Sequence, residues 1–281
     1  MEFRGMMGGF YRISEWIMRL SVINILWVIC AIPFFLLGLV LLQSQTGDQV
    51  VQTLFLMAVV SPFTIFPSTA AMFTVARKWL TGEEDVPLLK TFFRGYKENF
   101  LQSMLGGFIY ILLGVILYTN FRFYGSQTGV FGVLRFLVLS LTVVLIISLF
   151  HFFSIMTHLH MKWFQIVKNA ILITIGNPIR SLSMMVLNVI ILYVSFAIFT
   201  FLIPFFMGSF IAIVSFWHFN LIFGKLQEKQ QEIAEDQDEE EADRKQGGAE
   251  QESETRMERG QRPNESGAIE EGDYQGKNGK P

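Results

Sequence analysis

The 281-residue chain is 52% hydrophobic, contains 29 phenylalanines and has only 16% charged residues. Soluble domains average about 25% charged residues, so this composition excludes an ordinary water-soluble protein and indicates a chain built for lipid. The charge is segregated, because residues 1–224 hold 13 Lys and Arg against 7 Asp and Glu, whereas residues 225–281 hold 9 against 17.

Long apolar stretches define the expected membrane helices. A bilayer core about 30 Å thick needs roughly 20 apolar residues per helix. Five stretches lack Asp, Glu, Lys and Arg, and the last, residues 181–224, is long enough for two spans. A tight reversal near Pro204 and Gly208 divides it, with one long tilted helix as the alternative. The sequence therefore predicts an all-α bundle of six transmembrane helices, over residues 21–42, 51–76, 100–120, 135–158, 182–203 and 205–224.

The basic residues give the expected orientation of the bundle. Lys and Arg in short loops stay on the cytoplasmic side of the membrane. The N-terminal segment, the second and fourth loops and the start of the tail all hold Lys or Arg, whereas the first and fifth loops hold none. The third loop has only Arg122 and Arg135. This pattern predicts a multi-pass protein of the cell membrane with both termini in the cytoplasm.

Three cytoplasmic segments are amphipathic at the period of a helix, namely residues 1–20, 86–100 and 162–174. Such segments lie in the headgroup plane, with apolar side chains in lipid and charged ones outward. In the second segment aromatic and basic residues alternate, which is typical of a protein contact, although anionic lipid also accounts for the charges. Contacts with a partner or with lipid are therefore predicted for Phe93, Arg94, Tyr96, Lys97 and Lys168.

The C-terminal segment, residues 225–281, is a separate acidic tail. It contains few apolar residues and is rich in Glu, Asp, Gln, Lys and Gly. A segment of this composition cannot bury a core. Its first turns are strong helix formers that can prolong the last helix, and the remainder is predicted to be mostly disordered.

The predicted membrane spans contain few ionisable or nucleophilic side chains that could act in catalysis or bind a metal. Histidines 151, 158 and 160 end the fourth predicted helix and His218 lies in the sixth, but their spacing is not the i, i+4 pair of a helical metal site. Interhelical hydrogen bonding is the preferred interpretation of these histidines, with metal binding as the alternative. Nucleotide-binding and nucleophile motifs are absent from the sequence, and Cys30 is the single cysteine. The sequence therefore predicts no catalytic residue, cofactor or metal site, and no enzyme.

A helix break is expected in the second span. Prolines free backbone carbonyls inside a helix, and neighbouring hydroxyls can satisfy them, which makes a simple kink sufficient. The functional alternative is a broken helix that lines a substrate cavity. The residues concerned are Pro62, Thr64, Pro67 and Ser68.

The membrane body, residues 10–224, resembles the YesL-like family of bacterial multi-pass membrane proteins, a domain family of unknown function. At one position the sequence departs from the family, because Phe66 stands where a glycine is expected. The resemblance implies a role near sugar import, since genes of the family often lie beside genes for carbohydrate uptake and breakdown in Firmicutes. The residues that carry it are Asn24, Leu26, Trp27 and Pro33, then Thr64, Pro67, Ala70 and Ala71, then Gly82 and Glu83, and then Lys97, Asn99 and Phe100.

Two functions are consistent with these observations. The first is a non-catalytic accessory or regulatory partner of a carbohydrate-uptake system, with the lipid bilayer and components of a sugar transporter as its partners. The alternative is a membrane transport protein, facilitative or permease-like, for a small solute. Nucleic acid is not an expected partner, because the basic residues lie beside membrane spans, where anionic lipid accounts for them better.

Overall fold

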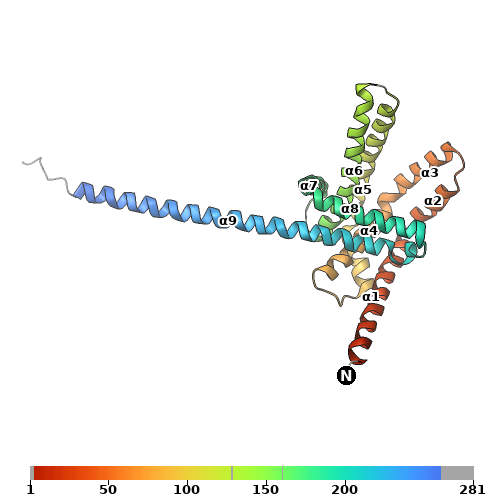
Figure 1. The fold of residues 1–281 in the computed structure, drawn as a ribbon, viewed down its shortest axis with the longest axis horizontal. Helices are drawn as coiled ribbons and strands as arrows, with labels where there is room; N and C mark the ends of the chain where they lie inside the picture. The colour runs from red at the N-terminus through yellow and green to blue at the C-terminus, as the bar shows by residue number, and fades with distance from the viewer. Residues whose placement is uncertain (1–2, 128, 160, 261–281) are drawn as a thin grey trace, which may run out of the picture. The chain divides into compact units, whose positions relative to one another are not determined.

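A computed structural model describes residues 3–127, 129–159 and 161–260 of the chain. Every regular element of these residues is a helix, which confirms the predicted all-α class. The chain divides into two compact units, Met1–Gly224 and Lys225–Pro281. The helices of Figure 1 are α1 (Phe3–Cys30), α2 (Ile32–Gln43), α3 (Gly47–Val60), η1 (Ser61–Phe63), α4 (Ile65–Leu80), α5 (Leu88–Gly125), α6 (Val130–His158), α7 (Trp163–Gly176), α8 (Pro178–Tyr193), η2 (Val194–Ile198), η3 (Ile203–Met207) and α9 (Gly208–Gly260).

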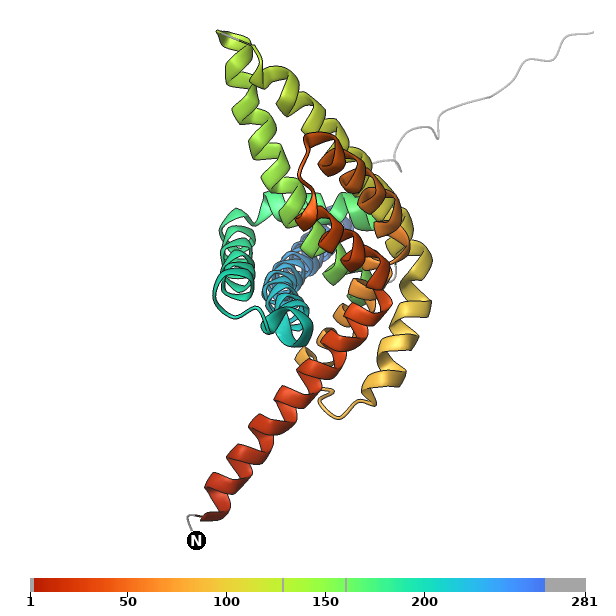
Figure 2. The same cartoon turned by 90° about the vertical axis from the view of Figure 1, so that its right-hand side faces the viewer.

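The first unit has the lengths and surface of a multi-pass membrane protein. Among the described residues, five helices are long and apolar enough to cross a bilayer, and the count is six if the bent pair α3–η1 and α4 forms one span. Large apolar side chains such as Leu42, Phe55 and Leu112 are exposed on the outside. Water would penalise these surfaces, whereas lipid accepts them. Figures 1 and 2 show two helical hairpins in this unit, α2–α3 and α5–α6, whose arms pack along each other.

Two of the predicted helix boundaries are wrong. The first span does not begin at residue 21, because α1 runs without a break from Phe3 to Cys30 and is interrupted only at Ala31, next to Pro33. The reversal between the last two spans occupies residues 199–202, before Pro204 rather than around it. Proline lacks a backbone N–H and therefore suits the first turn of a helix, where that donor has no partner. Residues 181–224 thus form two helices, as expected.

Small residues hold the core of this unit together. Much of α4 is buried, and Ala70, Ala71 and Ala76 have no exposed surface. On α5, a β-carbon added at Gly106 would lie 2.1 Å from Cζ of Phe152, which shows how closely α5 and α6 approach. Small residues at helix contacts are the usual route to close packing in membranes, because lipid provides no hydrophobic force between helices.

Asn24 joins the two ends of this unit. Its side chain is fully buried, its Nδ2 donates to the carbonyl of Ile203 over 2.9 Å, and its Oδ1 accepts from the backbone N–H groups of Gly208 (2.8 Å) and Ser209 (3.1 Å). These backbone groups belong to the irregular start of the last helix, where helical partners are incomplete. Gly208 therefore lies within a helix contact, against Asn24, Trp27 and Met72, rather than in the predicted reversal.

The second unit does not support the prediction of a mostly disordered tail over residues 225–260. Helix α9 continues to Gly260, and the side chains of residues 225–238 are all exposed. Glu, Gln, Lys, Arg and Ala are strong helix formers, so they prolong a helix that is already nucleated without burying any core. Residues 261–281 lie outside the described residues.

Candidate functional site

A polar cleft of about 1120 Å³ opens between two basic segments of the first unit. These segments, residues 86–100 and 162–174, are called the elbows below. Its walls come from the end of α4, the loop 81–87, the first turns of α5, the end of α6 and the start of α7. Gly82 lets the chain leave α4, because its φ of 95° lies in the left-handed region that favours glycine. Elements that lie 80 residues apart in the sequence thus form one site.

The acidic residues of the cleft are neutralised by neighbouring cations. Lys78 Nζ lies 2.7 Å from Glu83 Oε2, and Arg94 Nε lies 2.8 Å from Glu98 Oε1. Asp85 is paired with Arg19 of α1 over 2.5 Å. The hydrogen bond from Lys78 holds the pKa of the Glu83 carboxyl below its ordinary value.

Three further cations of the cleft form no ion pair within the described residues, although the charge of Arg77 contributes to the lowered pKa of the Glu83 carboxyl. Arg77, Lys90 and Lys162 line the cleft and make no ion pair with any residue that the structure describes. The Nε–H of Arg77 is also buried without a hydrogen-bond acceptor among these residues. A buried donor without an acceptor costs about 1–3 kcal/mol, and a charged one costs more. The cleft therefore carries uncompensated positive charge.

Two helix N-termini add to this positive potential. Helix α5 begins after Pro87 and α7 begins after Lys162, and neither has a side-chain cap. Residues of both first turns, Lys90 and Gln165 among them, line the cleft. Unpaired N–H groups and the helix dipole make such ends favourable for anions.

Amides fix the walls of the cleft against each other. Asn99 Nδ2 donates to Thr74 Oγ1 over 3.3 Å and to the carbonyl of Gly95 over 3.0 Å, which joins α5 to α4. Gln102 Nε2 donates to the carbonyl of Met161 over 3.2 Å, which joins α5 to the chain segment before α7. Helix α5, which carries Lys90, is therefore hydrogen-bonded to both neighbouring walls of the cleft, α4 on one side and the segment before α7 on the other.

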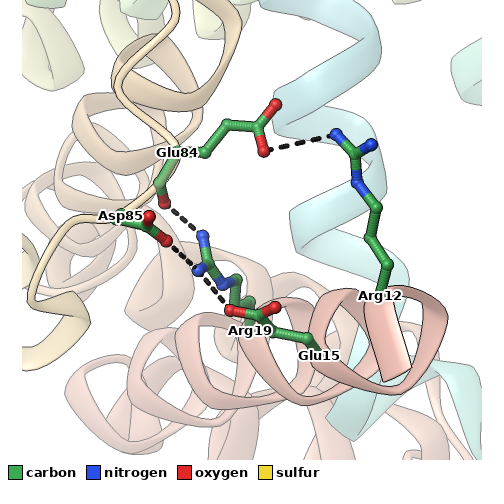
Figure 3. A network of polar contacts seen from close by, with 5 residues as sticks. All are labelled: Arg12, Glu15, Arg19, Glu84 and Asp85. Atoms are coloured by element: carbon green, nitrogen blue, oxygen red, sulfur yellow. Dashed lines mark hydrogen bonds and ion pairs between the residues drawn. The ribbon is translucent and has the colours of Figure 1, made fainter. Parts of the chain in front are cut away.

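Polar side chains in the middle of α1 bind the loop 81–87 that borders the cleft (Figure 3). Arg19, whose side chain is only 12% exposed, bonds to Glu15, to the carbonyl of Glu84 and to Asp85, while Arg12 lies 3.5 Å from Glu84. The apolar stripe that includes Phe10, Ile13 and Ile17 is exposed instead. The polar side of α1 thus faces protein and its apolar side faces outward, while its placement in the headgroup layer stays a prediction.

The predicted contact residues separate into two groups. Arg94 lines the cleft, whereas Phe93, Lys97 and Lys168 are exposed beyond its lining. Tyr96 is half-buried, with its ring 5.8 Å from that of Phe100.

The predicted contact residues did not include Arg77, Lys90 or Lys162. The available signal for a site was that Lys90 and Lys162 lie in two amphipathic basic segments and that Arg77 precedes the first of them. That signal does not show which lysines of an elbow face one another, because this depends on how the elbows pack.

The predicted helix break exists, with a bend of 46° between α3–η1 and α4. The hydroxyls of Thr64 and Ser68 donate to the carbonyls of Val60 and Ile65, so local backbone satisfies them. Pro62, Thr64, Pro67 and Ser68 do not line the cleft. Phe66 fits because the ring lies against Gly107 of α5, where an added β-carbon would be 3.0 Å away.

The described histidines lie in helix contacts. His151 Nε2 is 3.1 Å from Ser181 Oγ, His218 Nε2 is 3.4 Å from Ser183 Oγ, and the His158 ring is 4.9 Å from that of Phe223. No group of three metal-ligating side chains occurs in the described part of the chain. His160 lies outside the described residues.

Fold and site together define a multi-pass α-helical membrane protein with a basic cleft between two elbows. A model of the family described as "Protein of unknown function, DUF624" matches residues 20–121. The chain is 31% identical to the uncharacterized protein YteU of Bacillus subtilis over 84% of this chain and 94% of YteU. It is also 28% identical to the uncharacterized protein YesL of the same organism, over 73% of this chain and 85% of YesL. The chain therefore belongs to this YesL-like family of unknown function. No solved structure matches it.

Proposed function

We propose that this protein is a non-catalytic accessory or regulatory partner of a carbohydrate-uptake system in the bacterial cell membrane, and that the basic cleft is its docking site. Both termini and both elbows lie in the cytoplasm in this proposal. The observation that carries it is the meeting of Arg77, Lys90 and Lys162 in one cleft whose lining has two more cations than acidic residues, with no ion pair to these three among the described residues. The link to carbohydrate rests on the family resemblance.

The charge of the cleft favours a binding role. A stable membrane bundle does not need three uncompensated cations in one hollow, because like charges repel and a buried guanidinium donor without an acceptor is unfavourable. Such an arrangement is favourable when a negatively charged group of a partner enters, since complementary charge gives specificity and speeds association.

Site-specific photocrosslinking in native membranes tests the docking proposal. A photoreactive residue at Lys90, inside the cleft, should form an adduct with a subunit of a sugar importer. The same residue at Lys97, exposed on the same helix but outside the cleft lining, is the matched control. Equal adducts at both positions, or no importer subunit at position 90, would contradict the proposal.

The bend at Thr64 favours the second candidate, a transport protein for a small solute, because broken helices line the substrate sites of many transporters. Reconstitution of the pure protein in liposomes with a panel of sugars separates the two functions. The accessory proposal expects no saturable uptake by the protein alone. Saturable uptake that is lost on replacing Thr64 by valine would favour transport.

A further inference from the structure

We propose that the basic cleft binds a phosphate ester, with Arg77, Lys90 and Lys162 as the cations that hold its phosphate group. The inference deepens the proposed function, since it assigns a ligand class to the same cleft. It concerns the purified protein alone, so its test is independent of any importer subunit.

The charge balance of the cleft matches a phosphate. The lining holds five cations and three acidic residues, which leaves an excess of two positive charges, and Arg77, Lys90 and Lys162 are the cations without an ion pair within the described chain. A phosphate monoester carries up to two negative charges and several strong acceptor oxygens. A carboxylate carries one charge and two oxygens, and would leave more of the cationic charge unmatched.

The donors of the cleft also match a phosphate. Arg77 lines the cleft, and guanidinium groups bind phosphate oxygens with paired, charge-assisted hydrogen bonds. The uncapped first turns of α5 and α7 reach the cleft through Lys90 and Gln165. Backbone N–H groups at helix N-termini are a recurrent phosphate-binding element.

The size of the cleft indicates an ester rather than the free ion. Its volume of about 1120 Å³ slightly exceeds the range of about 300–1,000 Å³ that is usual for small-molecule pockets. The amides of Asn99, Gln102 and Gln165 lie in the same lining and provide hydrogen-bonding groups for the rest of the molecule. Both a soluble phosphate ester and the headgroup of a phospholipid have this chemistry.

Isothermal titration of the full chain in an uncharged, phosphate-free detergent tests the assignment with glycerol 3-phosphate as the probe. We expect saturable binding of glycerol 3-phosphate, and no binding of glycerol. Phosphatidylglycerol, added to the micelles, separates the two sources. Loss of glycerol 3-phosphate binding indicates a lipid headgroup as the natural occupant, and unchanged binding indicates a soluble ester, each of which supports a phosphate site.

Matched lysine variants locate the binding. Lys90→Gln and Lys162→Gln should each weaken binding about tenfold, because each removes one charge-assisted contact. Lys97→Gln and Lys168→Gln, on the same two helices but outside the lining, should change it by less than about twofold. All four lysines are exposed, so the variants should melt like the wild type. The absence of saturable binding, equal losses in all four variants, or tighter binding of succinate than of glycerol 3-phosphate would overturn the assignment.

Discussion

Replacing Asn24 by leucine should destabilise the membrane unit more than any comparable polar substitution on a helix surface. The amide makes three hydrogen bonds to backbone groups about 180 residues away, at 2.9 Å to Ile203 and at 2.8 and 3.1 Å to Gly208 and Ser209. Leucine has the same branching as asparagine and is larger, so no cavity forms, but one carbonyl and two N–H groups lose their partner.

The expected magnitude follows from these three bonds. A hydrogen bond contributes about 1 kcal/mol net in water-soluble proteins and about 0.6 kcal/mol on average between membrane helices. Donors and acceptors left buried without partners cost about 1–3 kcal/mol each, which raises the total. We expect a loss of about 2–5 kcal/mol in the free energy of unfolding, and a melting temperature lower by roughly 5–15 °C.

Thermal melting of the purified protein in detergent, followed by circular dichroism, measures this loss. The matched control is Asn120→Leu, because Asn120 Nδ2 donates over 2.8 Å to Ile116, one turn earlier on its own helix. Equal melting temperatures for Asn24→Leu and Asn120→Leu would refute the reasoning.

Two further predictions concern packing and orientation. Gly106→Leu should abolish folded protein, because a β-carbon there would lie 2.1 Å from the Phe152 ring. Gly114→Leu on the same helix should be tolerated, because a β-carbon there has nothing within 4 Å. Fluorescence-detected size-exclusion chromatography compares the amounts of folded protein of the two variants. Partial recovery in Gly106→Leu with Phe152→Ala would confirm the cause, and normal folding of Gly106→Leu alone would contradict it. Single cysteines at Glu84 and Ser126, in a background without Cys30, should differ in labelling of intact cells by an impermeant thiol reagent, with only the Ser126 position labelled. Labelling of the Glu84 position from outside would reverse the proposed orientation.

The prediction for the tail shows where composition alone misleads. The acidic segment has too few apolar residues to bury a core, and the side chains of residues 225–238 are indeed exposed. Composition nevertheless does not decide between coil and helix. The first turn of a helix is unfavourable to form, whereas each further residue extends an existing helix readily. A segment of good helix formers that follows the last membrane helix needs no nucleus of its own, and α9 continues to Gly260.

The sequence by itself determined that the protein is an all-α bundle of long apolar helices with basic elbows; the described residues have five or six candidate spans where six were predicted. These features follow from the thickness of a bilayer and from the cost of placing charge in it, which act on each segment separately. The reversal before Pro204 was located to within a few residues, because proline acts on its own helix. The break at Ala31, near Pro33, was missed, because it lies inside the predicted span 21–42.

Only the tertiary structure decided which residues of the elbows share a site. Lys90 and Lys97 belong to the same amphipathic segment, yet only Lys90 lines the cleft with Arg77 and Lys162. Asn24 likewise has its partners near residue 208, a contact that no local pattern encodes. The physical reason is that hydropathy and charge act along the chain, whereas a binding site depends on distances between helices, and those are set by side-chain packing such as that of Gly106 against Phe152.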